Sequence, residues 1–191
     1  MKYVLGIVSL IIVLFIVLLL ILGRGGDNKS QQQVVTPKDI VLVDQIAAGG
    51  SVRMTNQGRL VGDTERRAIA IVVTANERRL EVLSGFDETV VRTESFPNTS
   101  AAYETFLIAL NGAGFTQDRE STIKDDRAAC PLGRRYIYEV RDSNGGDLMR
   151  LWGTTCGKSA PGTVDGNEST IRRLFEAQIP DYTKRVRDVT L

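Results

Sequence analysis

The chain of 191 residues contains no histidine and only two cysteines. Without an imidazole group, Ser-His-Asp catalysis, Cys-His catalysis and histidine-based metal sites are excluded. Two cysteines are too few for a four-cysteine zinc site or for the framework of a small disulfide-rich domain. Aromatic residues are also scarce, at 6% of the chain. The missing histidine therefore shifts the expectation toward a protein that is not an enzyme.

Positive and negative charges are nearly balanced, because the chain has 24 lysines and arginines and 23 aspartates and glutamates. A nearly neutral chain argues against bulk electrostatic binding to nucleic acid, so no nucleic-acid partner is expected. The sequence also lacks a Gly-x-Ser-x-Gly elbow, a P-loop and the motif set of protein kinases. We predict no catalytic residue, no metal ligand and no cofactor.

The most prominent feature that is present is an uncharged apolar run from Tyr3 to Leu22. At 1.5 Å per residue such a run is long enough to cross a hydrocarbon core of about 30 Å. It is longer than the apolar part of a secretory signal peptide, which spans about 7–15 residues. We predict a transmembrane anchor over residues 1–23 that binds the lipid bilayer through 3–22. Cleavage near Gly23 or Gly25 is the alternative.

Residues 24–36 are rich in glycine, glutamine, asparagine and serine, and we predict a flexible linker there. The domain is then expected over 37–191. Lys2 on one flank against Arg24 and Lys29 on the other mildly favours a cytoplasmic domain. The cysteine pair favours an oxidising compartment instead. We expect a single-pass protein of the cell membrane whose C-terminal domain is extracytoplasmic.

The first part of the domain is predicted to be mostly strands. Thr36-Pro37 and Gly49-Gly50 resemble start and stop signals of a helix over 37–47. The turn-like segment 55–58 predicts a small hairpin between 52–54 and 59–61. A continuous apolar run predicts an interior strand over 68–73, paired with 80–84, and a third strand over 89–93.

Two amphipathic helices and one further hairpin are predicted in the second part. Asn98 and Asn167 are predicted to cap the starts of these helices. The apolar stripes that follow are Tyr103, Phe106, Leu107 and Leu110 in the first helix, and Ile171, Leu174, Phe175 and Ile179 in the second. A hairpin over 135–140 and 148–152 is connected by a glycine-rich turn, and 116–128 is predicted to be a loop. The order ββ(β)α–ββα predicts an α+β fold in which an antiparallel sheet carries two helices on one face.

Cys130 and Cys156 lie on either side of that hairpin, and their midpoint, Ser143, falls in its connection. Residues equidistant from a hairpin turn meet at its open end, so we predict a disulfide. Closing this loop of about 27 residues corresponds to roughly 3.5 kcal/mol in the chain-entropy model. Two buried thiols are the alternative.

Arginine accounts for 18 of the 24 basic residues. Eight of these arginines form the doublets 66/67, 78/79, 134/135 and 172/173. If these side chains converge, they suit an anionic envelope polymer. Because neighbouring strand residues point to opposite faces, a solvated surface is favoured. A hydrolase without histidine could use paired carboxylates or a Ser/Lys dyad. The carboxylates 87/88 and 125/126 are adjacent in predicted loops, where such pairs are ordinary surface. Acidic-glycine loops at 142–147 and 165–167 are assigned to turns or caps rather than to calcium.

Four stretches carry a resemblance: Phe96 to Phe106, Arg134 to Glu139, Leu151 to Gly157 and Leu174 to Tyr182. Through them the chain resembles a group of uncharacterised, single-pass, membrane-anchored bacterial envelope proteins, over roughly 38 to 183. The resemblance implies a location in the bacterial envelope and no activity. We expect a non-catalytic module for binding, adhesion or envelope assembly, with a protein or envelope polymer as partner. A carboxylate hydrolase and an accessory subunit of a membrane complex are the alternatives.

Overall fold

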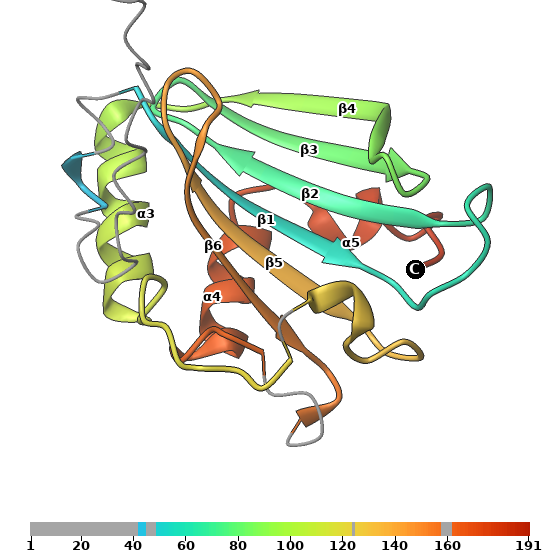
Figure 1. Ribbon diagram of the computed structural model, residues 1–191. Coiled ribbons are helices and arrows are strands. Elements are labelled where there is room, and N and C mark those ends of the chain that lie inside the picture. Colours follow the sequence, from blue (N-terminus) through green and yellow to red (C-terminus); the bar gives the residue numbers. More distant parts are fainter. Residues whose placement is uncertain (1–41, 45–48, 124, 158–161) are drawn as a thin grey trace, which may run out of the picture. The chain divides into compact units, whose positions relative to one another are not determined.

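The computed structural model describes residues 42–44, 49–123, 125–157 and 162–191 (Figure 1). All of them belong to the second of two compact units of the chain, Val35–Leu191. The predicted membrane anchor over 3–22, the linker over 24–36 and most of the predicted helix over 37–47 lie outside these residues. Within the described ranges, no helix has the length and apolar character needed to span a bilayer.

The described elements follow one another as four strands, a helix, a short 3-10 helix, two strands and two helices. They are β1 (Ser51–Gln57), β2 (Arg67–Val73), β3 (Glu77–Ser84), β4 (Thr89–Pro97), α3 (Ser100–Gly112), η2 (Asp126–Ala128), β5 (Arg135–Arg141), β6 (Asp147–Thr154), α4 (Glu168–Glu176) and α5 (Tyr182–Arg185). The α+β class is therefore confirmed.

The six strands form one sheet in the order β4-β3-β2-β1-β5-β6, and every neighbouring pair is antiparallel. Met54 on β1 lies opposite Ile71 on β2 and Tyr138 on β5. Strand β2 lies inside the sheet, as its continuous apolar run predicts. Only the pairing of β1 with β5 joins described strands that are distant in sequence.

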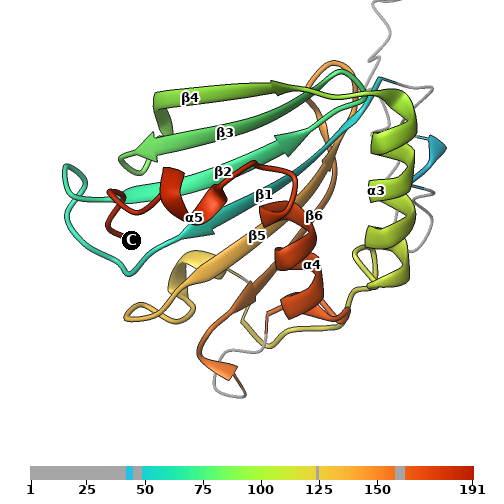
Figure 2. The ribbon, with the colours of Figure 1, turned by 180° about the vertical axis from the view of Figure 1, so that it is seen from behind.

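The main hydrophobic core lies between the sheet and the helices, on what we call the helix face (Figure 2). Alternate strand residues such as Met54, Ile71 and Tyr138 point into it, and all three are buried. Phe106 of α3 and Phe175 of α4 meet edge to face, with ring centroids 5.3 Å apart. Burying one such side chain stabilises the fold by about 1.5–3 kcal/mol. The predicted apolar stripes thus hold both helices on this face.

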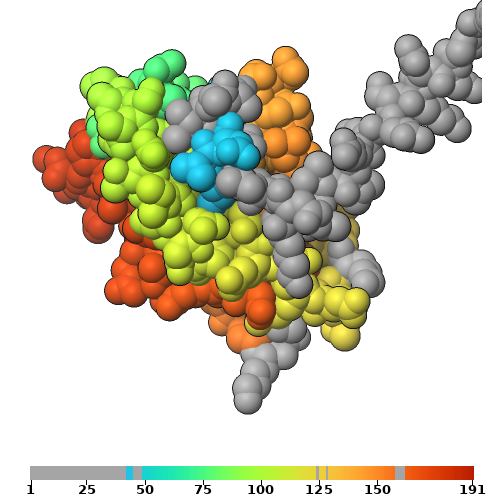
Figure 3. Space-filling view, turned by 90° about the vertical axis from the view of Figure 1, so that its left-hand side faces the viewer, coloured from blue at the N-terminus to red at the C-terminus, as the bar shows by residue number. Residues whose placement is uncertain are grey.

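The start of α3 differs from the prediction by one residue. Thr99, and not Asn98, is the N-cap: its hydroxyl accepts a hydrogen bond from the Ala102 amide. The side-chain amide of Asn98 instead donates to the Thr74 carbonyl at 2.6 Å, and this bond ties the start of the helix to the β2–β3 turn. Figure 3 shows α3 forming the outer surface on its side of the domain. For α4 the predicted cap is confirmed, because Asn167 Oδ1 accepts from the Thr170 amide.

The predicted hairpin over 52–54 and 59–61 is wrong. Residues 51–57 form the single strand β1, and Leu60 donates its amide to the Pro131 carbonyl rather than to β1. The polar segment that resembles a turn is buried strand, because β2 and β5 pair with it on both sides. Strand β4 is longer than predicted, and the four-residue α5 was not predicted because it has no apolar stripe.

Candidate functional site

The other face of the sheet, which we call the open face, carries charged and polar residues. Its central positions on β1 are Arg53, Thr55 and Gln57, whose neighbours on the same strand point into the core. In Figure 1, η2 stands in front of this face whereas α4 and α5 lie behind the sheet. The turn between β3 and β4 also reaches over the open face, since Gln57 Nε2 donates to Glu88 Oε1 at 2.7 Å.

Between these two projections lies a cleft of about 630 Å³, which is the candidate site. Its floor is formed by β1 and β5, including Thr55 and Ile137. One wall is the β3–β4 turn with Phe86, and the other is the segment of η2 with Arg127. The cleft therefore depends on segments that lie far apart in the sequence.

Ion pairs cross the floor of the cleft from strand to strand. Arg53 lies 3.7 Å from Glu88 and 3.6 Å from Glu139. Glu139 also lies 3.1 Å from Arg141 and 4.0 Å from Arg150, and only 7% of its side chain is exposed. One nearly buried carboxylate therefore serves three guanidinium groups. These ion pairs restrain the side chains that form the floor of the cleft. Because Glu139 is nearly buried, dissolved salt screens its interactions less than those of an exposed carboxylate.

The η2 wall contributes the second group of carboxylates. Asp126 Oδ1 lies 2.9 Å from Arg150, so Arg150 joins Glu139 on β5 to Asp126 in the wall. Asp125 accepts hydrogen bonds from the side chain and the backbone of Arg127, and these lower the pKa of Asp125. The wall thus presents two arginine-paired carboxylates to the cleft.

Two buried arginines beside the cleft are not paired with a carboxylate of the described chain. Arg66 is 5% exposed, donates to the Gly85 carbonyl at 2.7 Å and lies 4.8 Å from the Phe86 ring centroid. Arg135 is 1% exposed and donates to the Arg127 carbonyl at 3.2 Å. Burial, together with the nearby charge of Arg66, lowers the pKa of Arg135. The nearby charges of Asp126 and Asp125 oppose this lowering, but neither makes an ion pair with Arg135, so burying the two like charges is costly to the fold.

Several buried polar atoms of the same region have no hydrogen-bond partner within the described residues. Nε of Arg53 and Nε of Arg135 are donors in this condition, and Oε1 of Gln57 and Oδ2 of Asp126 are acceptors. Buried polar groups in native proteins are nearly always satisfied by protein, water or ligand. Four such atoms in one region show that the described residues leave the polar groups around the cleft incompletely satisfied.

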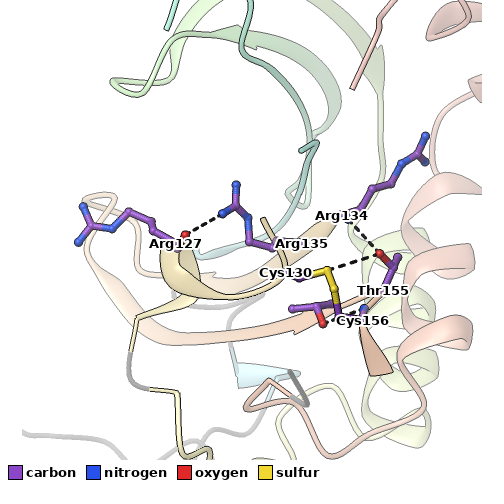
Figure 4. Close-up of a disulfide and its surroundings, with 7 residues drawn as sticks. Arg127, Cys130, Arg134, Arg135, Thr155 and Cys156 are labelled. Atoms are coloured by element: carbon purple, nitrogen blue, oxygen red, sulfur yellow. Dashed lines mark hydrogen bonds between the residues drawn. A yellow bond between two sulfur atoms is a disulfide. The ribbon is translucent and has the colours of Figure 1, made fainter. Parts of the chain in front are cut away.

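The predicted disulfide is present and secures the η2 wall. The sulfur atoms of Cys130 and Cys156 lie 1.97 Å apart, and the two Cα atoms 5.6 Å (Figure 4). Cys130 follows η2 by two residues, so the bond ties the wall to the end of β6. In Figure 4, the side chains of Arg134 and Arg135 extend away from one another, and Arg135 reaches Arg127 in the wall.

The arginine doublets do not converge on one surface, as the alternation of strand residues predicts. Arg66 lines the cleft, whereas Arg67 bonds to Ser84 and to the Thr64 carbonyl. Arg79 pairs with Glu77 and Glu81, while Arg78 bonds to the Pro97 carbonyl. The doublets thus supply only part of the cleft.

Of the adjacent carboxylates singled out in the sequence, Glu88, Asp125 and Asp126 meet at the cleft, whereas Asp87 accepts from Thr89 at the turn. Arg53 and Glu139, which organise the floor, were missed. A charged residue within an otherwise apolar strand was the available signal, because such a residue must find a partner across the sheet.

The acidic-glycine loop at 142–147 has the structural role that was assigned to it. Asp142 Oδ1 accepts the amides of Asn144 and Gly146, both at 2.8 Å, and so closes the β5–β6 turn. In the described part of the chain no group of three or more acidic or cysteine side chains is placed to hold a metal ion. No protein-family model matches the chain, and no curated protein is similar to it. The likeness to uncharacterised envelope proteins therefore remains a resemblance.

Proposed function

We propose that this protein is a non-catalytic binding module of the bacterial envelope, anchored through residues 3–22, whose cleft takes an acidic group of an envelope polymer. The observation that carries the proposal is the buried guanidinium group of Arg66, which lines the cleft and lacks a carboxylate partner among the described residues, with Arg135 buried beside it. An oxyanion between the walls would offset the cost of burying them.

The unpartnered donors and acceptors of this region limit the kinds of ligand that would satisfy them. Nε of Arg53 and Nε of Arg135 need an acceptor, whereas Oε1 of Gln57 needs a donor. A carboxylate beside hydroxyl groups, as in a sugar acid, supplies both within a few ångströms. The carboxylates already in the cleft disfavour a highly charged polyanion, because their repulsion would oppose it. We therefore favour a polymer that carries isolated uronic acid residues.

The test compares Arg66→Gln with Arg67→Gln in the full-length chain, reconstituted in neutral-lipid nanodiscs. The two arginines are adjacent, but only Arg66 lines the cleft, so Arg67→Gln is a matched control. The probes are a glucuronate-containing oligosaccharide and poly-glutamate, titrated by calorimetry at low salt. We expect Arg66→Gln to weaken binding of the oligosaccharide at least tenfold and Arg67→Gln to change it less than twofold.

Equal affinities of the two variants would overturn the assignment of the cleft, and so would the absence of binding to the wild-type chain. Preferential binding of poly-glutamate would contradict the sugar-acid ligand in favour of an acidic protein partner. Thermal unfolding of both variants checks that the loss of a buried arginine has not unfolded the domain.

The location belongs to the same proposal and is supported by the uncharged run and by the cysteine pair, because disulfides persist in oxidising compartments. Intact cells treated with an alkylating reagent should leave Cys130 and Cys156 unmodified until a reductant is added. Protease added outside the cells, after outer barriers are opened, should digest the domain. Alkylation without reductant, together with protection from protease, would contradict this topology.

A hydrolase built from carboxylates is the second candidate, and one observation favours it. Glu139 and Asp126 both lie within 4.0 Å of Arg150, so two carboxylates approach one guanidinium group at the cleft. Glycosidases use such pairs. Turnover of a glycoside that is lost in both Glu139→Gln and Asp126→Asn, with binding retained, would support the enzyme. Binding of the oligosaccharide without turnover by the wild-type chain would favour the module.

A further inference from the structure

A second cavity, of about 790 Å³, opens at the beginning of β5 and is separate from the cleft. Three arginines line it from three segments: Arg59 follows β1, Arg134 precedes β5, and Arg172 belongs to α4. We call this cavity the basic pocket. Arg134, which lines the basic pocket, is the neighbour of Arg135, which lies beside the cleft. The side chains of these two residues extend away from one another (Figure 4).

The guanidinium groups of the basic pocket are available to a ligand. Within the described residues, none of Arg59, Arg134 and Arg172 makes an ion pair with a carboxylate, in contrast to four of the five arginines that line the cleft. Arg172 is held over the ring of Tyr136, with 4.9 Å between the guanidinium carbon and the ring centroid. Stacking orients a guanidinium while leaving its N–H groups free to donate.

The base of the basic pocket is rigid. Tyr136 is only 4% exposed, and the Arg134 amide donates to Thr155 Oγ1 at 2.9 Å. Gly133 lies against the disulfide, because a Cβ at this position would clash with the sulfur of Cys130. The backbone that carries Arg134 is thereby fixed before any ligand arrives.

One acidic side chain, Glu176, also lines the basic pocket. Burial raises the pKa of Glu176, while the charges of Arg172 and Arg134 oppose that rise. Three guanidinium groups face this side chain and the terminal carboxylate of Leu191, which also lines the pocket, so positive groups remain in excess. An anion that enters therefore gains more from the arginines than it loses to Glu176 and Leu191.

We infer that the basic pocket binds a phosphate monoester group. Guanidinium groups that approach from three segments suit a tetrahedral dianion, which offers oxygens in several directions. A planar carboxylate, by contrast, is satisfied by one bidentate arginine. A phosphate monoester carries a charge of about −1.5 to −2 at pH 7, which fits the positive lining. This site goes beyond the cleft and its sugar-acid ligand.

The experiment titrates glycerol 3-phosphate into the full-length chain in neutral-lipid nanodiscs at pH 7.5 and low salt. Arg172→Gln and Arg134→Gln are compared with Arg173→Gln, the neighbour of Arg172, which bonds to the Ser169 carbonyl instead. We expect saturable binding that weakens at least tenfold in the first two variants and less than twofold in Arg173→Gln. Glu176→Gln should strengthen binding, because it removes the repulsive carboxylate.

Three results would overturn the site: no saturable binding to the wild-type chain, equal weakening in Arg173→Gln, or equal affinity for acetate. Arg66→Gln, which alters the cleft, should leave the affinity for glycerol 3-phosphate unchanged, so failure of one site is distinguishable from failure of the other. The source of the phosphate is found by adding phosphatidic acid to the nanodiscs. A higher apparent Kd for glycerol 3-phosphate would assign the group to a lipid, and an unchanged Kd to a soluble ester.

Discussion

The Glu139 carboxylate lies within 4.0 Å of three guanidinium groups, on Arg53, Arg141 and Arg150. Replacing it with glutamine keeps the shape of the side chain but leaves three positive charges without their shared partner. We expect Glu139→Gln to lower the free energy of unfolding by about 2 kcal/mol, measured by urea denaturation at pH 7.

Glu77→Gln is the control for this prediction. Glu77 also pairs with an arginine, Arg79, but 38% of its side chain is exposed, so the pair is solvated. Loss of this pair in Glu77→Gln should lower the free energy of unfolding by less than about 1 kcal/mol. Equal effects of the two substitutions would contradict the special position of Glu139.

Tyr182 gives a prediction on pH. Burial raises the pKa of Tyr182 from 10.0 to about 12. The folded state therefore holds the phenolic proton more tightly than the unfolded state, so this contribution to stability is complete below pH 10 and is lost as the pH rises toward 12. Relative to Tyr182→Phe, the wild-type chain should lose about 2 kcal/mol of unfolding free energy over this window, measured by urea denaturation. Parallel curves for the two proteins would contradict the assignment.

At the scale of elements, helix α3 depends on its N-cap, Thr99, which lies one residue after the predicted cap, Asn98. Thr99 satisfies the Ala102 amide. Thr99→Ala should lower the free energy of unfolding by about 1 kcal/mol, measured by thermal or urea denaturation. Thr105→Ala is the matched control, because the Thr105 hydroxyl bonds back to the Ala101 carbonyl inside the helix and alanine is the better helix former. A loss in Thr105→Ala as large as in Thr99→Ala would contradict the cap.

Elements with a strong local signal could be predicted. The Asn144-Gly145 turn, between segments in which side chains alternate in facing, predicted the β5–β6 hairpin. The apolar stripes of α3 and α4 predicted which faces of these helices are buried. The prediction failed at β1, where Thr55, Asn56 and Gln57 are polar and precede a glycine. These residues are strand because β2 and β5 pair with them, and pairing of that kind has no local signature.

The same reason hides the cleft from the sequence. Arg53, Glu139 and Arg150 lie on three strands and become neighbours only through the register that places Arg53 opposite Glu139 and Glu139 opposite Arg150. The disulfide could be predicted because both cysteines flank one hairpin. A site assembled across the sheet requires the order of the strands, which local patterns do not contain.

At the scale of the molecule, the disulfide should stabilise both the fold and the cleft. Reduction, or the double substitution Cys130→Ser with Cys156→Ser, should lower the free energy of unfolding by about 3.5 kcal/mol, measured by urea denaturation. Affinity of the oxidised chain for the sugar-acid oligosaccharide should also exceed that of the reduced chain, because Cys130 anchors the η2 wall.

The control is the affinity for the oligosaccharide at a temperature where circular dichroism shows that the reduced chain is still folded. Unchanged affinity there would mean that the wall keeps its position without the bond. Unchanged unfolding energy would contradict the contribution of the disulfide to the fold.

The order of the strands also has a consequence for how the chain folds. Strands β1 to β4 form a meander of neighbours, and β5 with β6 forms a hairpin, so both parts are made of local pairings. The pairing of β1 with β5 must instead close a loop that contains β2, β3, β4 and α3. Closing a long loop costs entropy before its contacts form. We therefore expect the joining of these two parts to govern the folding rate, so that substitutions at the contact between β1 and β5 slow folding more than substitutions within the meander or within the β5–β6 hairpin.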